Sequence, residues 1–223
     1  STRELVTQIE SKKRCEKKLP LWYSTPGIYY PPKISIEQAS SQATAKYKAQ
    51  LIKGEHVLDA TGGFGVDSYY FSLHVQRVVH CEINEALSTI VRHNAETLHA
   101  KHLFCHVGDG MTYLQNSNEQ FDTIYIDPSR RLNTHKVFKI TDCEPDVKAN
   151  LDLLTKKYAR VIIKTSPLLD IKSGLADLKN VREIHVVSVK NDCKELLWII
   201  DPDFKGNEPL IYCAAIDDKE NTN

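Results

Sequence analysis

From residue 56 onward, short apolar runs alternate with stretches in which apolar residues recur every three or four positions. Strands are predicted for the apolar runs at 56–59, 75–82, 103–107, 121–127, 160–165, 183–190, 195–201 and 210–216. Helices are predicted at 67–73, 85–99, 111–115, 143–158 and 170–178. Continuous apolar strands between helices are typical of a parallel sheet covered on both faces. The pattern therefore predicts an α/β fold with a doubly wound, mostly parallel sheet.

One pair of neighbouring strands breaks this alternation. The runs at 183–190 and 195–201 are separated only by Asn191-Asp192-Cys193-Lys194. A parallel crossover needs about a dozen residues or more, so these two strands are expected to pair as an antiparallel hairpin. We expect this hairpin at one end of the sheet.

Upstream of the first strand the periodicity is helical. Apolar residues from Ile36 to Leu51 follow a three- or four-residue spacing, and Ser35 with Gln38 forms a capping box. Gly54 then stops the helix. One helix is therefore predicted from Ser35 to the residues just before Gly54.

The first 32 residues divide into two parts. Residues 1–19 carry six basic and three acidic side chains and are interpreted as a helix with a solvated face, with a phosphate-contacting arm as the alternative. Residues 19–32 hold four prolines and one glycine, which forbid a regular helix and predict an extended strap. This strap would lie over the domain or line the mouth of a pocket. We therefore expect a segment at 1–32, a main domain at 33–205, and a strand and tail at 206–223, with the start of a second domain as the alternative reading of that tail.

Composition narrows the class of protein without identifying it. The 223 residues carry 29 basic and 29 acidic side chains, 41% are hydrophobic, and no apolar run approaches the roughly 20 residues that cross a bilayer. A disordered chain, a membrane protein and a secreted precursor are thereby disfavoured. The chain starts at Ser1 and its only methionine is Met111, so a processed or excised piece is expected.

The six cysteines show no two-residue spacing of the kind that metal knuckles and redox pairs use. Cys81 and Cys213 lie in apolar runs and are expected to be buried thiols, which favours a reducing, cytoplasmic location. The stretch from His99 to His106 predicts no metal site, because Cys105 and His106 would lie on opposite faces of a strand.

The strongest local signal is Val57-Leu-Asp-Ala-Thr-Gly-Gly-Phe-Gly-Val-Asp67, in which a strand enters a glycine-rich turn that opens a helix. In an open α/β sheet, ligands bind at this end of the strand. A dinucleotide fingerprint would need a third glycine where Ser68 stands. Asp59 would also repel a diphosphate, whereas it suits a cation. S-adenosylmethionine carries an ammonium and a sulfonium but no phosphate, so it is the predicted cofactor.

Two further acids follow the next strands. Glu82 stands 23 positions after Asp59, near the offset of about 20 residues expected of a ribose-binding carboxylate. Asp109, between two glycines after the third strand, is placed to accept from an adenine amino group. The predicted cofactor-binding residues are Asp59, Thr61, Gly62, Gly63, Gly65, Asp67, Glu82, Ile83, Asp109 and Gly110.

Through VLDATGGFGVD, HCEIN, VGDG and YIDPSRR, residues 33–201 resemble the class I S-adenosylmethionine-dependent methyltransferases. The stretches IEQASSQ with AKYK, DPSRR and VSVKNDCKEL are similar to an uncharacterised bacterial group in which a THUMP-like domain follows. A more distant likeness is to RNA guanine methyltransferases of the trimethylguanosine-synthase type. The resemblance implies a seven-stranded, Rossmann-like sheet, with a THUMP-like domain absent from this chain.

The resemblance places the methyl acceptor after the fourth strand, at Asp127-Pro128-Ser129-Arg130, which are the predicted catalytic residues. Amine-methylating relatives have an acidic or amide residue here, followed by Pro-Pro-aromatic. This chain keeps Asp127 and Pro128, so Asp127 can accept an amine N–H, but it lacks the stacking aromatic. Arg130 and Arg131 are interpreted as a phosphate or carboxylate clamp, with a structural pairing to nearby acids as the alternative.

The sequence therefore predicts a methyltransferase that uses S-adenosylmethionine, with an exocyclic amine of an RNA base as the favoured acceptor. Neither IDPSRR nor KTSP contains the cysteine nucleophile that methylation of a pyrimidine carbon requires. The RNA substrate rests on the resemblance, because the net charge is zero. The alternatives are a methyltransferase acting on a protein or small molecule, and a cofactor-binding module that is inactive without a missing domain.

Overall fold

A computed structural model describes residues 2–130, 140–156, 160–206 and 208–217 of the chain. The chain forms two compact units, Ser1–Tyr113 and Leu114–Asn223. Neither the boundary predicted near residue 32 nor that near 205 coincides with this division, and both remain predictions. Within the described residues, no helix is both long enough and apolar enough to span a membrane.

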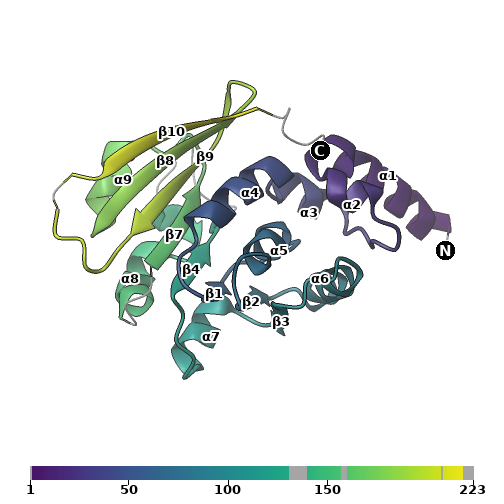
Figure 1. The fold of residues 1–223 in the computed structure, drawn as a ribbon, viewed down its shortest axis with the longest axis horizontal. Coiled ribbons are helices and arrows are strands. Elements are labelled where there is room, and N and C mark those ends of the chain that lie inside the picture. The colour runs from purple at the N-terminus through teal and green to yellow at the C-terminus, as the bar shows by residue number, and fades with distance from the viewer. Residues whose placement is uncertain (1, 131–139, 157–159, 207, 218–223) are drawn as a thin grey trace. The chain divides into compact units, whose positions relative to one another are not determined.

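The first unit is built on three parallel strands in the order β1-β2-β3 (Figure 1). The strands are β1 (His56–Asp59), β2 (Arg77–Glu82) and β3 (Leu103–Val107). Its helices are α1 (Thr2–Lys18), α2 (Pro20–Ser24), α3 (Lys33–Gln38), α4 (Gln42–Leu51), α5 (Val66–Ser72) and α6 (Glu85–Thr97). Helix α7 (Gly110–Asn116) begins here and continues into the second unit. Because the strands are parallel, their carboxyl ends share one edge.

The helix predicted from Ser35 onward is in fact two helices, so this prediction is wrong. Helix α3 ends at Gln38, and α4 starts at Gln42 after a break at residues 39–41. The cap is Ser41, whose hydroxyl accepts from the Thr44 N–H at 3.2 Å. The break occurs because serine side chains that hydrogen-bond to the backbone compete with a continuous helix.

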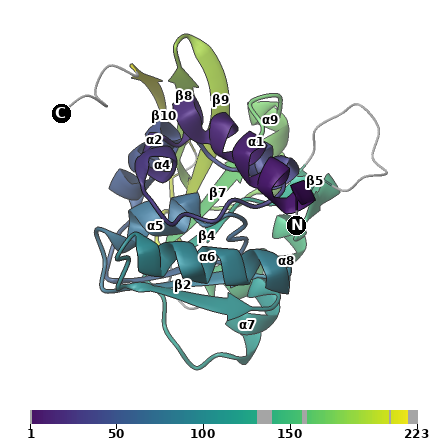
Figure 2. The same ribbon diagram turned by 90° about the vertical axis from the view of Figure 1, so that its right-hand side faces the viewer.

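The proline-rich strap also departs from its prediction, since residues 20–24 form the short helix α2. Pro20 stands in the first turn, where its missing N–H breaks no helical hydrogen bond. Helix α2 lies beside α1 (Figure 2). Trp22 of α2 is buried and contacts Tyr69 of α5 edge-on, with ring centroids 5.0 Å apart, and its ring centroid lies 6.4 Å from that of Phe64 in the glycine-rich turn.

Beyond α2, two side-chain amides fasten the strap. The Asn94 amide on α6 accepts from Tyr29 N and donates to Tyr29 O, both at 2.8 Å. The Gln8 amide on α1 accepts from Tyr30 N at 2.9 Å and donates to Tyr30 O at 2.7 Å. Consecutive strap residues are thus bound to two different helices of the first unit, each by a pair of hydrogen bonds.

The second unit contains five strands in the order β10-β8-β9-β7-β4. They are β4 (Thr123–Ile126), β7 (Arg160–Thr165), β8 (Val181–Val189), β9 (Asp192–Ile200) and β10 (Leu210–Ile216). Strands β4 and β7 are parallel, and β9 runs antiparallel to both β7 and β8. The predicted hairpin is therefore confirmed. It is not the outermost element, because β10 pairs in parallel with the outer edge of β8 (Figure 1).

Smaller elements complete this unit. They are β5 (Ser129–Arg130), a 3₁₀ turn at Ile140–Asp142, β6 (Cys143–Glu144), α8 (Val147–Thr155) and α9 (Ile171–Asp177). The helix predicted from Cys143 starts later, because Cys143–Glu144 pairs with β5 and Asp146 caps α8 by accepting from Ala149 N at 3.0 Å. The predicted end of that helix, at residues 157–158, lies outside the described residues.

Strand β10 is exposed although its sequence is apolar. Leu210 is 60% exposed and Tyr212 44% exposed, because β10 is an edge strand. Cys213 is consequently exposed, contrary to its prediction, whereas Cys81 on the internal strand β2 is buried as expected.

The predicted class is confirmed: this is an α/β, Rossmann-like fold with a mostly parallel sheet and an antiparallel hairpin. The main sheet has eight strands where seven were predicted, since β10 adds one.

Candidate functional site

The glycine-rich turn between β1 and α5 is held from beneath by β2. Gly62 N donates to Cys81 O at 2.8 Å, and Gly65 N donates back to Gly62 O at 2.9 Å. The buried His80 ring lies 3.3 Å from Gly63 O through Nε2. Burial lowers the pKa of His80 to about 4, so the ring is neutral and Nε2–H donates to that carbonyl.

Two glycines of the predicted set have different reasons to be glycine. Gly63 has a φ of +54°, and a Cβ built on it would meet no atom closer than Thr61 O at 4.0 Å. Gly110 approaches β1 so closely that a Cβ would lie 2.2 Å from Ala60 O. The left-handed conformation therefore requires glycine at position 63, whereas packing of α7 requires glycine at position 110.

Asp59, at the end of β1, turns its carboxylate into the protein. It is 1% exposed, its Oδ1 accepts from Thr61 N at 3.2 Å, and its Oδ2 accepts from the Ser68 hydroxyl. The Asp59 carboxylate thus lies beneath the turn and is oriented by Thr61 at its start and by Ser68 in the helix that follows it.

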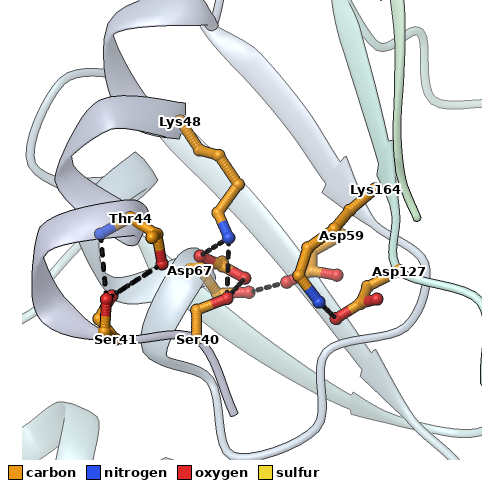
Figure 3. Close-up of polar contacts among 9 residues, drawn as sticks. Ser40, Ser41, Thr44, Lys48, Asp59, Asp67, Asp127 and Lys164 are labelled. Carbon is orange, nitrogen blue, oxygen red and sulfur yellow. Dashed lines mark hydrogen bonds and ion pairs between the residues drawn. The ribbon is translucent and has the colours of Figure 1, made fainter. Parts of the chain in front are cut away.

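Asp67 is engaged by the N-terminal part of the chain. The Ser40 hydroxyl donates to its Oδ2 at 2.7 Å, and Lys48 Nζ lies 3.0 Å from its Oδ1 (Figure 3). The predicted role of Asp67 toward the cofactor remains a prediction. Sequence reasoning missed Lys48 because a lysine on a helix usually faces solvent, and only its place on the buried face of α4 could have revealed it.

Glu82 ends β2 and links the turn to the next helix. Its Oε2 accepts from Gly63 N at 3.0 Å, and its Oε1 accepts from Asn84 N at 2.7 Å. Asn84 is in turn the N-cap of α6. Between them, Ile83 is 74% exposed, an unusual environment for isoleucine. A carboxylate and an exposed apolar side chain therefore lie next to each other at this edge.

Asp109 lies at the same edge, after β3. Its Oδ1 accepts from Thr112 N at 2.7 Å, so one oxygen fixes the first turn of α7. Gly108 N donates to Glu82 O at 3.0 Å, which ties the end of β3 to the end of β2. The parallel strands thus bring the ends that carry Asp59, Glu82 and Asp109 together, as predicted from their spacing.

In the second unit, Asp127 directly follows β4 and is paired with a residue that sequence reasoning missed. Lys164 Nζ on β7 lies 2.5 Å from Asp127 Oδ2 (Figure 3). Ile126 and Ile163 are register partners in the parallel pair, so the residues after them stand side by side. The side chain of Asp127 is 30% exposed and that of Lys164 is 16% exposed. A lysine ending an apolar strand in register with Asp127 was the signal available in the sequence.

The other predicted catalytic residues are placed less specifically. Pro128 is half-buried, and the Ser129 hydroxyl reaches Glu144 O at 3.4 Å within the β5–β6 pair. The side chain of Arg130 and the whole of Arg131 lie outside what the structure describes, so the proposed clamp remains a prediction.

The fold is an α/β, Rossmann-like fold shared with solved proteins described as methyltransferases. No protein-family model matches the chain. A crystal structure described as a methyltransferase of Porphyromonas gingivalis W83 is similar with a TM-score of 0.82 and 33% identity, over 91% of this chain and 50% of that one.

Curated relatives are similar at a lower level of identity. An uncharacterised S-adenosylmethionine-dependent methyltransferase of Mycobacterium tuberculosis, found in two strains, is 25% identical over 165 residues. The match covers 74% of this chain and 44% of the relative, so the chain spans less than half the length of that relative.

Two streptococcal structures share the fold. One, from Streptococcus mutans, was solved with S-adenosylhomocysteine; it has a TM-score of 0.50 and 13% identity, over 71% of this chain and 94% of that one. The other, an rRNA methylase of Streptococcus thermophilus, has a TM-score of 0.51 and 11% identity, over 71% and 93%.

Proposed function

We propose that this chain is the catalytic domain of an S-adenosylmethionine-dependent methyltransferase. The observation that carries the proposal is the Glu82 carboxylate, which Gly63 N and Asn84 N fix beside the exposed Ile83. The curated relatives and the fold support the same conclusion.

The geometry of Glu82 suits a ribose. A carboxylate has about four lone-pair positions, and the two backbone donors occupy one on each oxygen. Each oxygen can therefore accept one further hydrogen bond, which matches the two hydroxyls of a ribose. Ile83 would cover one face of the adenine, and Asp109 Oδ2 would accept from its amino group. Asp59 would supply negative charge beneath the turn for the cationic methionyl part.

The reaction requires little covalent chemistry from the protein. The acceptor nitrogen attacks the sulfonium methyl, the S–CH₃ bond breaks with its electron pair left on sulfur, and the nitrogen then loses a proton. Most of the catalysis is in-line positioning of the two reactants. Asp127 would accept an N–H of the acceptor and take up the released proton, which then passes to solvent.

For the acceptor, we propose an exocyclic amine of an RNA base. The Asp127–Lys164 pair supports this assignment, because a carboxylate and an ammonium 2.5 Å apart complement an edge with an N–H next to an acceptor atom. Many bases present such an edge. The similarity to an rRNA methylase shows only a common fold and does not itself indicate the substrate.

The partners and location belong to the same proposal. The relatives are about twice as long as the matched region, which supports a second, THUMP-like domain that captures RNA in the whole protein. A cytoplasmic location is supported by the cysteines, all six of which are free thiols, and by RNA as the proposed substrate.

Two experiments test the proposal. Titration calorimetry should show that S-adenosylhomocysteine binds and NAD does not, and absence of binding by the former would refute a cofactor site of this kind. Transfer of a labelled methyl group should then mark total RNA depleted of modification. Label found only in a protein lysate or a metabolite extract would instead support a different substrate class.

A further inference from the structure

A buried lysine links the N-terminal part of the first unit to the glycine-rich turn. Lys48 on α4 is 0% exposed, and its Nζ lies 3.0 Å from Asp67 Oδ1 and donates to Ser40 Oγ at 2.7 Å (Figure 3). Ser40 in turn donates to Asp67 Oδ2 at 2.7 Å. Ammonium, hydroxyl and carboxylate therefore form a closed triangle between the α3–α4 break and the first turn of α5.

We propose that Lys48 is a positioning residue for cofactor binding, which acts by holding Asp67 and hence the glycine-rich turn in its binding geometry. The inference rests on the proposed function. It adds to that function a residue outside the strand-end set, on an element that precedes the first strand.

The path from Lys48 to the turn is short and continuous. Asp67 and Ser68 are consecutive residues in the first turn of α5, whose N-cap is Gly65 in a left-handed conformation. Ser68 donates its hydroxyl to Asp59 Oδ2, while Asp67 points to α4. The first turn of α5 is thus fixed to Lys48 through Asp67, and it fixes Asp59 through Ser68. A shift of Asp67 would move Ser68 and with it the carboxylate beneath the turn.

A buried ion pair is not required for stability at such a position. Well-packed apolar residues of the same volume usually stabilise a protein as much or more, because desolvation offsets the attraction between the charges. What a buried pair provides is a defined relative placement of two elements. The charge of Lys48 also balances that of Asp67.

The second unit supplies a matched control. Arg160 and Glu183 form another ion pair, at 3.4 Å, with side chains that are 9% and 16% exposed. This pair joins β7 to β8, and neither residue belongs to the predicted site. Its loss should affect stability without any specific effect on the turn.

The test compares four variants of the chain with the wild type. Lys48→Met removes the charge, K48M/D67N replaces the pair by neutral residues of similar size, Ser40→Ala removes only the hydroxyl, and Arg160→Met breaks the control pair. Affinity for S-adenosylhomocysteine is measured by calorimetry well below each melting temperature. Hydrogen exchange of the Gly62, Gly63 and Gly65 amides is measured without ligand.

We expect K48M/D67N to melt within a few degrees of the wild type, to bind S-adenosylhomocysteine at least fivefold more weakly, and to exchange the turn amides faster. Ser40→Ala should show a smaller loss, and Arg160→Met should lower the melting temperature with affinity within twofold of the wild type. The double variant decides the question even if Lys48→Met does not fold.

Wild-type affinity and wild-type exchange in K48M/D67N would overturn the inference. The same would follow if Arg160→Met weakened binding as much as the Lys48 variants at an equal drop in melting temperature. If the wild type itself fails to bind S-adenosylhomocysteine, the proposed function fails, and the exchange comparison still decides whether Lys48 positions the turn.

Discussion

The two units hold their strand-end carboxylates by different means. In the first unit, Asp59, Glu82 and Asp109 each accept from backbone N–H groups of the turn that follows or adjoins them. In the second unit, Asp127 is paired with the side-chain ammonium of Lys164. Backbone donors cannot swing away from their acceptor, whereas a lysine side chain has four carbons of freedom. The first arrangement suits a ligand that is always the same, and the second suits an acceptor that must enter and leave.

The largest effect that separates the two units is expected from Asp127→Asn. The amide removes the proton acceptor, so kcat should fall by about 10²- to 10⁴-fold, the range typical of losing a general base. Affinity for S-adenosylhomocysteine should stay within twofold, as measured by calorimetry beside single-turnover methyl transfer. Asp152→Asn is the control, because it makes the same change at an exposed carboxylate on α8 that belongs to no predicted site. A change in cofactor affinity without a change in kcat would reverse the assignment of the two units.

His80, beneath the turn of the first unit, predicts a dependence of stability on pH. Burial lowers its pKa from 6.5 to about 4 in the folded protein, so the unfolded chain binds the extra proton first as the pH falls. The contribution is complete above pH 6.5 and is lost progressively between about pH 6.5 and 4, amounting to about 3 kcal/mol. Urea unfolding at pH 7.5 and 4.5 measures it. His80→Gln, which can still donate to Gly63 O, should flatten this difference; an unchanged pH profile would show that another group titrates.

Glu82→Gln tests whether a carboxylate that is held by backbone N–H groups in the first unit binds the cofactor. The amide of glutamine would place an N–H₂ against Gly63 N or Asn84 N, and charge-assisted bonds to the ligand would be lost. Affinity for S-adenosylhomocysteine should fall by about 10- to 30-fold, equivalent to about 1.4–2 kcal/mol. Glu85→Gln removes an exposed charge from the same helix start and is the matched control. Equal losses in both variants would reduce the role of Glu82 to general electrostatics.

Lys164→Met gives the smallest expected effect and tests the Asp127–Lys164 ion pair of the second unit. The KM for the RNA acceptor should rise by about tenfold, about 1.4 kcal/mol, with cofactor affinity unchanged. Combined with Asp127→Asn, the loss should be less than additive, because the two residues act on one acceptor edge. Steady-state methyl transfer to RNA measures both. Strict additivity would mean that Lys164 and Asp127 serve different groups.

Strands were the most predictable part of the fold. The ranges predicted for β3, β7 and β10 coincide with those observed, because a buried or paired strand is recorded in consecutive apolar residues. The break at residues 39–41 was not predictable in this way. The serines at these positions do not interrupt the three- or four-residue spacing of the apolar residues. Ser40 donates its hydrogen bond to Asp67, which is distant in sequence.

In the candidate site, too, the position of the residues was predictable from local sequence, whereas their contacts were not. The spacing of Asp59, Glu82 and Asp109 with the strands was enough to predict a shared edge. Their orientation depends on which backbone N–H each one meets, which a sequence does not state. Lys48 and Lys164 were missed because the signals for them, a place on the buried face of a helix and a place near the end of an apolar strand, do not name the acidic partner.

The strap fastened by Gln8 and Asn94 has a consequence for how this chain can vary. Each amide forms two hydrogen bonds to the main chain of a single strap residue, Tyr29 or Tyr30, and none to its side chain. The identity of the residues at these two positions is therefore weakly constrained by the fastening. Their number is strongly constrained, since an insertion or deletion between Gly27 and Pro31 would shift both pairs at once. The two pairs of hydrogen bonds therefore constrain the length of this segment more than its side chains.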